Sequence, residues 1–432
     1  MYHVSLSLSR ACVFALALGS ATASCTFNPS GQVAGPDGST EPQPDADLSR
    51  PDANPGAFDA RPVDARVDAP DARVPPDPPP GCESWTPRHF DPCAIPAPSA
   101  ELLLTRAGDY VYNTDARTLT DPQGGQITHA SGELAGNPAV TIVSVDRFLV
   151  GSTARLRVVG NKPLLVASWS ELTVEGTIDV SSNASGRGAG ANTGTCDPAS
   201  VGEQNGNGGG GGGGGGFQAD GGSGGGGNGS GGGEGGRNGR AVATPPTVRG
   251  GCSGAAGGGG ASATGNGAAG SSGGALQLTA QTLISITGKL HAGGQAGGGA
   301  NGTSQRKGGG GGGGSGGLLG LESPTITIAA GAVLAANGGG GGEGTNNTAG
   351  ATGVDGQLGA AVARGGSGGS GGDGGDGGAQ APVKGEDGTD GAANGANSSG
   401  GGGGGGGAGY IIIEGTESVG GGAVLSPQPV LR

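Results

Sequence analysis

The residues of this chain with the most specific chemistry are its cysteines. Two of the six, Cys12 and Cys25, lie near the N-terminus. The other four are Cys82, Cys93, Cys196 and Cys252. An even set in an exported chain is typical of disulfides, and four cysteines allow three pairings, of which proximity in sequence favours 82–93 and 196–252. Metal binding needs close Cys-x-x-Cys or Cys/His groupings, which these cysteines lack, so the sequence predicts disulfides and no metal site.

Acid–base catalysis on a repetitive β fold would need acids and bases clustered on one face. The histidines are scattered, at positions 3, 89, 129 and 291. Glu175 and Asp179 flank Gly176, but the aligned positions of later repeats hold Thr287 with His291, and Ala330 with Leu334. No acidic ladder forms, and His291 is expected to be an outward strand residue. The sequence therefore predicts no enzyme, with a carbohydrate-processing β-helix enzyme as the alternative.

Two ligand motifs are incomplete in this chain. The stretch LISITGKL has Leu283 and Leu290 where a phosphate-binding loop needs glycine and Ser or Thr. The stretch GGDGGDGGA at 371–379 has Gly378 where a calcium nonapeptide has an apolar residue, and the motif does not repeat. No cofactor is therefore predicted. The net charge of −13, with scattered Lys and Arg, also argues against a nucleic-acid partner.

The first 24 residues are predicted to be a signal peptide. Arg10 precedes the apolar run 11–18, which is too short to span a bilayer, and small residues follow up to Ser24. Ala-Ser-Cys at 23–25 resembles the lipobox of bacterial lipoproteins, which implies lipidation of Cys25, although Thr22 stands where that family usually has Leu. Residues 21–23 also fit an ordinary cleavage site. We expect an exported protein held by lipid in the outer membrane or at the cell surface, or secreted if Cys25 is not lipidated.

Residues 25–81 are predicted to be a disordered stalk. Positions 26–81 hold 13 of the 27 prolines, and their 4 arginines and 10 acids give 4 − 10 = −6 of the net charge of −13. Such a composition cannot bury enough apolar surface to offset the cost of ordering, and proline favours extended polyproline II. The stalk would hold the folded part, residues 82–432, away from the membrane.

From about residue 100 the apolar residues come in short alternating bursts typical of strands, with no convincing helix. Three segments align on Gly176, Gly288 and Gly331. Leu164, Leu276 and Leu319 stand twelve residues before these glycines, and Ile178, Leu290 and Val333 stand two residues after them. Three short strands with a glycine corner predict one turn of a parallel β-helix, or β-solenoid. A β-sandwich would need systematic hairpin dipeptides, which are missing.

Two details of this alignment are less regular. In the third segment Ile326 and Ile328 stand one residue early, and Ala329-Ala330 is expected to restore the phase like a β-bulge. A fourth segment, YIIIEG at 410–415, repeats the leading strand of LLGLES and then stops. The expected fold class is therefore all-β, a parallel solenoid with long inserts at 181–275, 293–318 and 336–410.

These inserts hold almost all of the 109 glycines. Residues 365–379 are Gly-Gly-X triplets whose X residues are Ser367, Ser370, Asp373, Asp376 and Ala379. Collagen is excluded because it needs Gly-X-Y with abundant proline. In a threefold extended helix the glycines would pack against neighbours, as in polyglycine II, and Ser367, Ser370, Asp373 and Asp376 would form an exposed edge. A flexible linker is the alternative.

The layout resembles the glycine-rich exported lipoproteins of myxobacterial type, often labelled PE-PGRS-like. The resemblance rests on the leader, on TFNPSG at 26–31, HFDPC at 89–93 and residues 156–182, and on the glycine-rich inserts. The inserts are also similar to polyglycine-II tip adhesins of phage tails and to a springtail antifreeze protein. These resemblances imply a surface-displayed structural or adhesive lipoprotein whose partners are the membrane and cell-surface glycans or matrix. Ice binding is less favoured because the edge residues are too mixed.

Overall fold

The computed structural model describes one compact unit within Pro75–Arg432. The described residues are 78–228, 231–260, 265–301, 307–369, 371–393 and 398–432. The predicted signal peptide, Cys25 and the predicted stalk as far as residue 77 lie outside the described residues.

The described part of the chain is almost entirely β structure, which confirms the all-β prediction. Two 3-10 helices, η1 (Cys82–Ser84) and η2 (Pro92–Ala94), precede the strands, and these ranges contain no α-helix. An 11-stranded sheet contains β1 (Leu102–Leu104), β5 (Ala130–Leu134), β6 (Val140–Val145), β7 (Phe148–Val150), β9 (Leu164–Ser168), β10 (Glu171–Val174), β12 (Ala275–Ala280), β13 (Leu283–Ile286), β15 (Leu318–Ile328), β17 (Tyr410–Val419) and β19 (Val430–Leu431). An eight-stranded sheet contains β2 (Gly108–Asn113), β3 (Thr118–Thr120), β4 (Gln126–Ile127), β8 (Ala154–Val159), β11 (Thr177–Asp179), β14 (Lys289–His291), β16 (Val333–Ala335) and β18 (Val424–Ser426).

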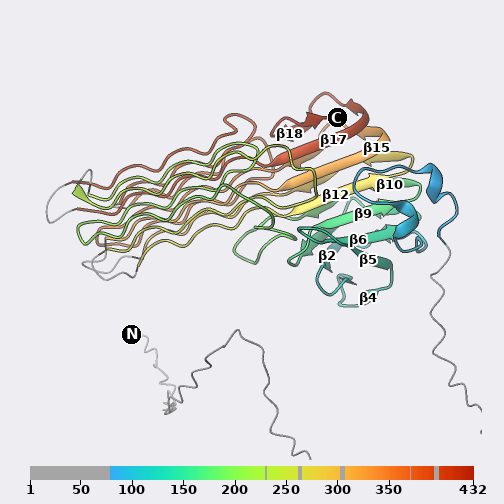
Figure 1. Cartoon of the computed structure of the whole chain (residues 1–432), viewed down its shortest axis with the longest axis horizontal. Coiled ribbons are helices and arrows are strands. Elements are labelled where there is room, and N and C mark those ends of the chain that lie inside the picture. The colour runs from blue at the N-terminus through green and yellow to red at the C-terminus, as the bar shows by residue number, and fades with distance from the viewer. Residues whose placement is uncertain (1–77, 229–230, 261–264, 302–306, 370, 394–397) are drawn as a thin grey trace, which may run out of the picture. The chain divides into compact units, whose positions relative to one another are not determined.

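Most strands belong to a repeating set of three, two in the larger sheet and one in the smaller. Successive repeats are β6–β7–β8, β9–β10–β11 and β12–β13–β14, then β15 with β16, where β15 supplies both strands of the larger sheet. Each strand pairs in parallel with its counterpart in the next repeat (Figure 1). The larger sheet has two arms, one made of the first strands of the repeats and one made of their middle strands. The sheet curls because both arms join at β15, which pairs with β12 in one arm and with β13 in the other.

The core consists of apolar side chains that stack from repeat to repeat. Leu164 pairs with Leu276, and Leu276 with Leu319, as the alignment predicts. The middle strands place Leu172, Ile284 and Ile326 in register, which also confirms the prediction. All of these side chains are at most 1% exposed. Full burial of such a side chain contributes about 1.5–3 kcal/mol, so the stacked rows stabilise the sheets together.

The predicted alignment is wrong at the corner between β15 and β16, in the third aligned segment. Leu290 pairs with Leu334 rather than Val333, because five residues separate Ile328 from Leu334 where three separate Ile286 from Leu290. Ala329-Ala330 therefore does not restore the phase.

The three corner glycines also differ in what they do. A Cβ on Gly288 would lie 2.0 Å from the carbonyl oxygen of Gly176, so this corner needs glycine for close stacking. Gly331 has open space around it but a φ of +83°, so it is needed for a left-handed turn.

The segment that begins with YIIIEG continues beyond residue 415, contrary to the prediction. Strand β17 continues alongside β15 as far as Val419, β18 pairs with β16, and β19 begins a further layer on β17. Upstream, β6, β7 and β8 form another repeat that the alignment did not include. The stack of repeats is therefore longer at both ends than the three aligned glycines indicated.

The first strands of the repeats are buried on both faces. Their outer side chains, such as Leu165 and Tyr410, belong to a second apolar cluster that contains Trp85 and Phe217. Trp85 packs edge-on against Trp169, with ring centroids 5.1 Å apart. The segment before the strands and part of the first insert thus cover the outside of the larger sheet.

The glycine-rich inserts all leave after the third strand of a repeat and return at the first strand of the next. They occupy 180–274, 292–317 and 336–409, between β11 and β12, β14 and β15, and β16 and β17 respectively. We call their described residues the glycine bundle. The segments of the bundle run side by side away from one end of the strands (Figure 1).

Segments of the bundle are joined by backbone hydrogen bonds with a period of three, as the run 400–407 shows. Its amides donate in rotation to three neighbours, at 339–345, 209–215 and 386–389. Its carbonyls accept from three others, at 372–378, 310–316 and 222–225. The run therefore has six neighbours. The other pure-glycine runs, 208–216, 308–314 and 338–342, are enclosed in the same way.

Enclosure on all sides explains why these runs are pure glycine. A Cβ on Gly403, Gly404 or Gly405 would lie 2.0–2.1 Å from a carbonyl oxygen, each time in a different neighbouring segment. No residue of the period can therefore carry a side chain. Segments at the rim of the bundle have fewer neighbours and can carry a side chain where they face outward.

Candidate functional site

The two predicted disulfides, Cys82–Cys93 and Cys196–Cys252, are confirmed. The first joins η1 to η2. The second spans 56 residues of the first insert and, on the loop-entropy account, stabilises the folded chain by about 4 kcal/mol. Arg249 donates to both of its sulfur atoms, at 3.2 Å from Cys196 Sγ and 3.3 Å from Cys252 Sγ. This bridge therefore fixes the first insert to itself where it joins the strands.

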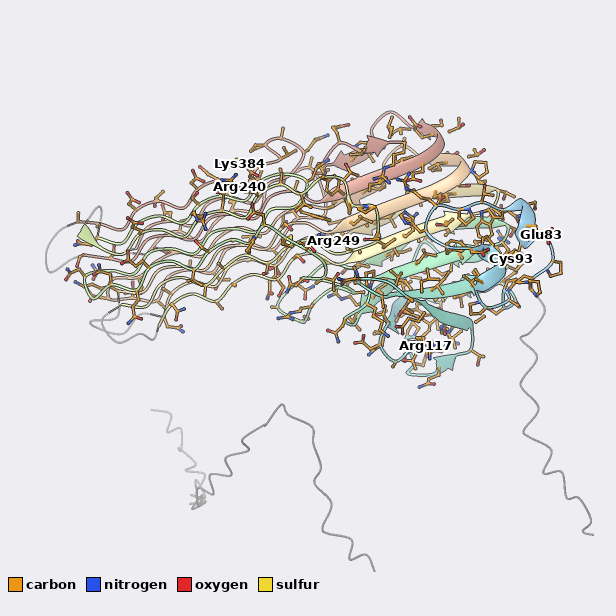
Figure 2. The ribbon with its side chains drawn as sticks, in the orientation of Figure 1. Glu83, Cys93, Arg117, Arg240, Arg249 and Lys384 are labelled. Carbon is orange, nitrogen blue, oxygen red and sulfur yellow. A yellow bond between two sulfur atoms is a disulfide. The ribbon has the colours of Figure 1, made fainter. Side chains whose placement is uncertain are left out.

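In the rim segments, exposed side chains and buried glycines recur with a period of three. In the segment 233–240, Glu234, Arg237 and Arg240 are exposed, whereas the glycines at 233, 236 and 239 are buried. Side chains accordingly project from the outside of the bundle, among them Arg240 and Lys384 (Figure 2). The rim thus displays carboxylates, guanidinium groups, amines and hydroxyl groups on a backbone scaffold.

The predicted exposed edge at 365–379 is correct only in part. Ser367 and Asp373 are exposed, and Ser370 lies outside the described residues. Asp376 is half-buried, because its Oδ1 accepts a hydrogen bond from the amide of Gly365 at 2.8 Å. Ala379, the last X residue, is fully buried. The edge therefore carries side chains that also bind the bundle's own backbone.

This capping of backbone amides recurs around the rim. Asp387 and Asp390 accept from the amides of Ser223 and Gly226, at 2.7 and 2.6 Å. The amide of Asp373 donates to Thr389 Oγ1 at 2.7 Å. A rim segment lacks a neighbour on its outer side, so side chains replace the missing carbonyl partners. Sequence analysis missed this role, although the Asp and Thr residues at every third position were its signal.

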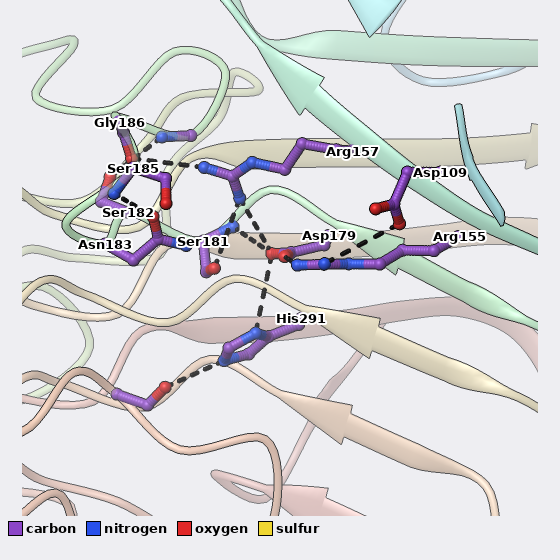
Figure 3. Close-up of polar contacts among 12 residues, drawn as sticks. Asp109, Arg155, Arg157, Asp179, Ser181, Ser182, Asn183, Ser185, Gly186 and His291 are labelled. Carbon is purple, nitrogen blue, oxygen red and sulfur yellow. Dashed lines mark hydrogen bonds and ion pairs between the residues drawn. The ribbon is translucent and has the colours of Figure 1, made fainter. Parts of the chain in front are cut away.

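A second polar cluster lies on the smaller sheet, around Asp179. The side chains of Arg157, Asp179 and His291 stand in register on β8, β11 and β14 (Figure 3). Asp179 contacts Arg155 Nη2 at 2.5 Å, Arg157 Nη1 at 3.1 Å and His291 Nδ1 at 3.6 Å. His291 does point outward, as predicted, but the third insert covers it, and its Nε2 lies 3.0 Å from the carbonyl oxygen of Gly356.

The electrostatics of the cluster indicate a structural tie. Burial alone would raise the pKa of Asp179, but the hydrogen bond from Ser181 and the charges of Arg157 and His291, with the bond from Arg155, hold this pKa below its ordinary value. A general base must reach a substrate proton, whereas Asp179 is 2% exposed and engaged by two guanidinium groups. The cluster joins three repeats and the third insert.

Substitution of Asp179 tests this role. Asp179→Asn leaves Arg157 without a carboxylate and Arg155 with Asp109 alone, so the free energy of unfolding in urea is expected to fall by about 3 kcal/mol. The matched control is Glu175→Gln, which removes an exposed carboxylate next to the same corner and should leave this free energy nearly unchanged. Equal effects of the two substitutions would contradict the structural role.

His291 gives the fold a pH dependence of definite sign. Burial lowers the pKa of His291 below its ordinary value of 6.5, and the attraction of Asp179 does not compensate. The unfolded chain therefore binds a proton that the folded chain refuses, so stability present above pH 6.5 is lost as the pH falls below it. We expect the melting temperature to fall between pH 7.5 and 5.5, with a smaller slope for His291→Gln. His89, whose pKa burial also lowers, acts in the same sense. A stability that rises on acidification would refute this assignment.

A pair of glutamates that sequence analysis missed lies at the other end of the repeats. Glu322 and Glu414 are register partners on β15 and β17. They line a cleft of about 350 Å³ together with Trp85 and Ser323. Glu414 pairs with Arg432 at 2.9 Å, and burial raises the pKa of Glu322. The match between LLGLES and YIIIEG already placed these two acids side by side and was the signal for them.

Within the described ranges, no group of three or more His, Cys, Asp or Glu side chains is arranged to hold a metal ion. The same ranges contain no helix of the length and hydropathy that crossing a bilayer requires. No protein-family model, curated protein or solved structure matches the chain.

Proposed function

We propose that this protein is a surface-displayed structural or adhesive module without catalytic activity. The observation that carries the proposal is the threefold rotation of hydrogen bonds in the pure-glycine runs, each of which has neighbours on all sides. The pure-glycine runs give such a bundle an interior made largely of backbone, and its exposed side chains project from the rim. It is therefore a stiff projection that displays polar groups.

The architecture we infer is a parallel β-solenoid that carries a polyglycine II bundle. The solenoid is supported by the in-register stacking of successive three-strand repeats around one apolar core. Polyglycine II is supported by the period of three and by neighbours that only glycine can approach so closely. In this arrangement the solenoid sets the spacing at which the inserts start and return.

Export and lipidation at Cys25 remain part of the proposal, because an adhesive module must be displayed. Cys25→Ser is expected to move the protein from the membrane fraction of its host to the soluble fraction, since the thiol is the atom that would carry the lipid. The measurement is fractionation followed by immunoblotting, with Cys12→Ser as the control that keeps Cys25. A Cys25→Ser variant that stays fully membrane-bound would show that another feature anchors the chain.

The partner we propose is a cell-surface glycan or matrix polymer. Rim carboxylates, guanidinium and hydroxyl groups form hydrogen bonds with sugar hydroxyls, and repetition along the rim adds weak contacts into useful avidity. The test is a glycan-array and cell-binding screen, beside an assay for released reducing sugar. Binding without release supports adhesion, and Glu234→Ala with Arg237→Ala should weaken it. Release of sugar from polysaccharide would overturn the adhesive proposal.

A carbohydrate-processing enzyme is the second candidate, and the pair Glu322 and Glu414 favours it. Register partners on adjacent parallel strands are about 4.8 Å apart, close to the spacing of carboxylates in retaining glycosidases. However, both acids already contact arginine or backbone groups. If turnover is found, Glu322→Gln should abolish it and leave binding to the bundle intact.

A further inference from the structure

One row of the rim differs from the other three rows in its backbone amides. Each row consists of three neighbouring segments, and the middle segment points every third amide outward. In three rows these amides are capped by side chains: at Ser223 and Gly226, at Asp373 and Asp376, and at Ala296 and Gly299. In the fourth row the outward amides of Ser253 and Ala256 have no partner among the described residues.

We call this fourth row the amide face. It consists of the segments 199–205, 252–259 and 265–273, which are joined by the bonds from Gly202 to Ala256 and from Gly254 to Gly270. The face also offers acceptors, since the carbonyl oxygens of Val201, Gln204 and Ser253 receive no hydrogen bond from the described residues. A surface with free donors and free acceptors in one patch can pair with a copy of itself.

The side chains of the amide face are small and almost all uncharged. The outward residues are Val201, Gln204, Ser253, Ala256, Asn266, Ala268 and Ala269. Glu203 is the one charged residue of the three segments, and its carboxylate turns to the margin, where it accepts from the amide of Glu234 at 2.9 Å. A shallow groove of about 700 Å³ crosses the face between residues 200–204 and 256–259, and Glu234 and Arg237 of the adjoining segment line its margin.

The net charge of the chain decides which occupant this face fits. Two copies of a chain with net charge −13 repel one another, and the other rows carry outward carboxylates such as Asp373, Asp387 and Asp355. Two copies meet with the least repulsion through the uncharged face. A contact of the same patch on both copies is the usual geometry of a twofold homodimer.

We propose that the amide face is a self-association surface through which two copies of this chain pair, bundle against bundle. The segment 252–259 is about 25 Å long at roughly 3.1 Å per residue, so the contact is smaller than a standard stable interface. The dimer is therefore a weak one that forms at micromolar concentrations or above. The inference goes beyond the adhesive role, because it concerns how displayed copies contact each other.

The test is sedimentation velocity of the full chain carrying Cys25→Ser, so that no lipid causes association, from low-micromolar to near-millimolar protein. The mass is expected to rise from one chain toward two. Ser253→Glu with Ala268→Glu places charges at two exposed positions of the face and should weaken association at least tenfold. The matched control, Ser367→Glu with Ala360→Glu, adds the same charge at exposed sites off the face and should leave the dimer intact.

A second measurement covers the case in which the charged variant fails to fold. Ala269 is exposed, so Ala269→Cys should form a disulfide-linked dimer on mild oxidation, whereas Ala360→Cys should not. The proposal is overturned if the parent keeps the mass of one chain throughout. It is also overturned if both glutamate variants weaken association equally, or if Ala360→Cys cross-links as well as Ala269→Cys. Binding of a glycan at this face without dimer formation would likewise overturn it.

Discussion

Gly403→Ala with Gly404→Ala, in the run 400–407, is expected to destabilise the glycine bundle by at least about 3 kcal/mol. The two new Cβ atoms would lie 2.0 Å from the oxygen of Gly311 and 2.1 Å from that of Gly222. Overpacking of this kind costs about 1–3 kcal/mol per site, and here the atoms met are backbone that cannot rotate away. Limited proteolysis of the third insert is the measurement, with urea unfolding beside it.

The sign of this effect separates the bundle from a flexible linker. In a disordered segment Gly→Ala reduces the freedom of the unfolded chain, so it is neutral or stabilises by about 0.4–1 kcal/mol. The control is Gly359→Ala in the same insert, because a Cβ there meets nothing within 4 Å. If the double variant is as resistant to protease as the Gly359→Ala chain, the interior run is not enclosed.

Ile286→Asp is expected to abolish cooperative folding of the strands. Ile286 is 0% exposed and pairs with Val174 on one side and Ile328 on the other. A carboxylate buried between two repeats without a partner costs several kcal/mol, a large share of the total stability of a domain. Circular dichroism during thermal unfolding measures the effect.

The control for this substitution is Thr287→Asp, since Thr287 is the exposed next residue of the same corner. It introduces the same charge outside the core, so its melting curve should stay close to that of the parent. A parent-like melting curve for Ile286→Asp would mean that the inward direction assigned to this strand is wrong.

The stacking of repeats could be predicted from the sequence because it depends on local periodicity. Leu164, Leu276 and Leu319 recur at one offset from a glycine, and the register they imply is the one observed. The corner at Gly331 could not be predicted, because two different turns both use glycine, one for close approach and one for positive φ. The prediction ended the segment that begins with YIIIEG too early. The continuation of this segment, Thr416–Val419, exposes more side chains than the middle strands of the other repeats do.

The glycine pattern of the whole chain indicates more about the structure than the single stretch 365–379 does. Runs of five or more glycines lie where a segment has six neighbours, whereas shorter runs and Gly-Gly-X lie at the rim, so the number of consecutive glycines reports how enclosed a segment is. The partners of each segment are not visible in the sequence, because glycines are identical to one another. The caps on the amides of Ser223 and Gly226 are not visible in the sequence either, because the aspartates that form them lie 164 residues away.

The candidate sites could likewise be predicted only in part. The disulfides could be predicted from cysteine count and spacing. The sequence prediction compared only the residues next to the corner glycines. The partners of Asp179, Arg155 and Arg157, come from the preceding repeat, which the alignment does not include. A complete register would have placed an arginine, an aspartate and a histidine side by side.

Hydrogen exchange of the backbone amides tests the central claim, an ordered glycine bundle, most directly. In the parent chain under native conditions, amides of the runs 208–216, 308–314 and 400–407 should exchange far more slowly than an unfolded chain, because each donates to a neighbouring segment. The outward amides of Ser253 and Ala256, which have no partner among the described residues, should exchange quickly. Exchange of the three runs at unfolded-chain rates would contradict the bundle and leave the inserts as linkers.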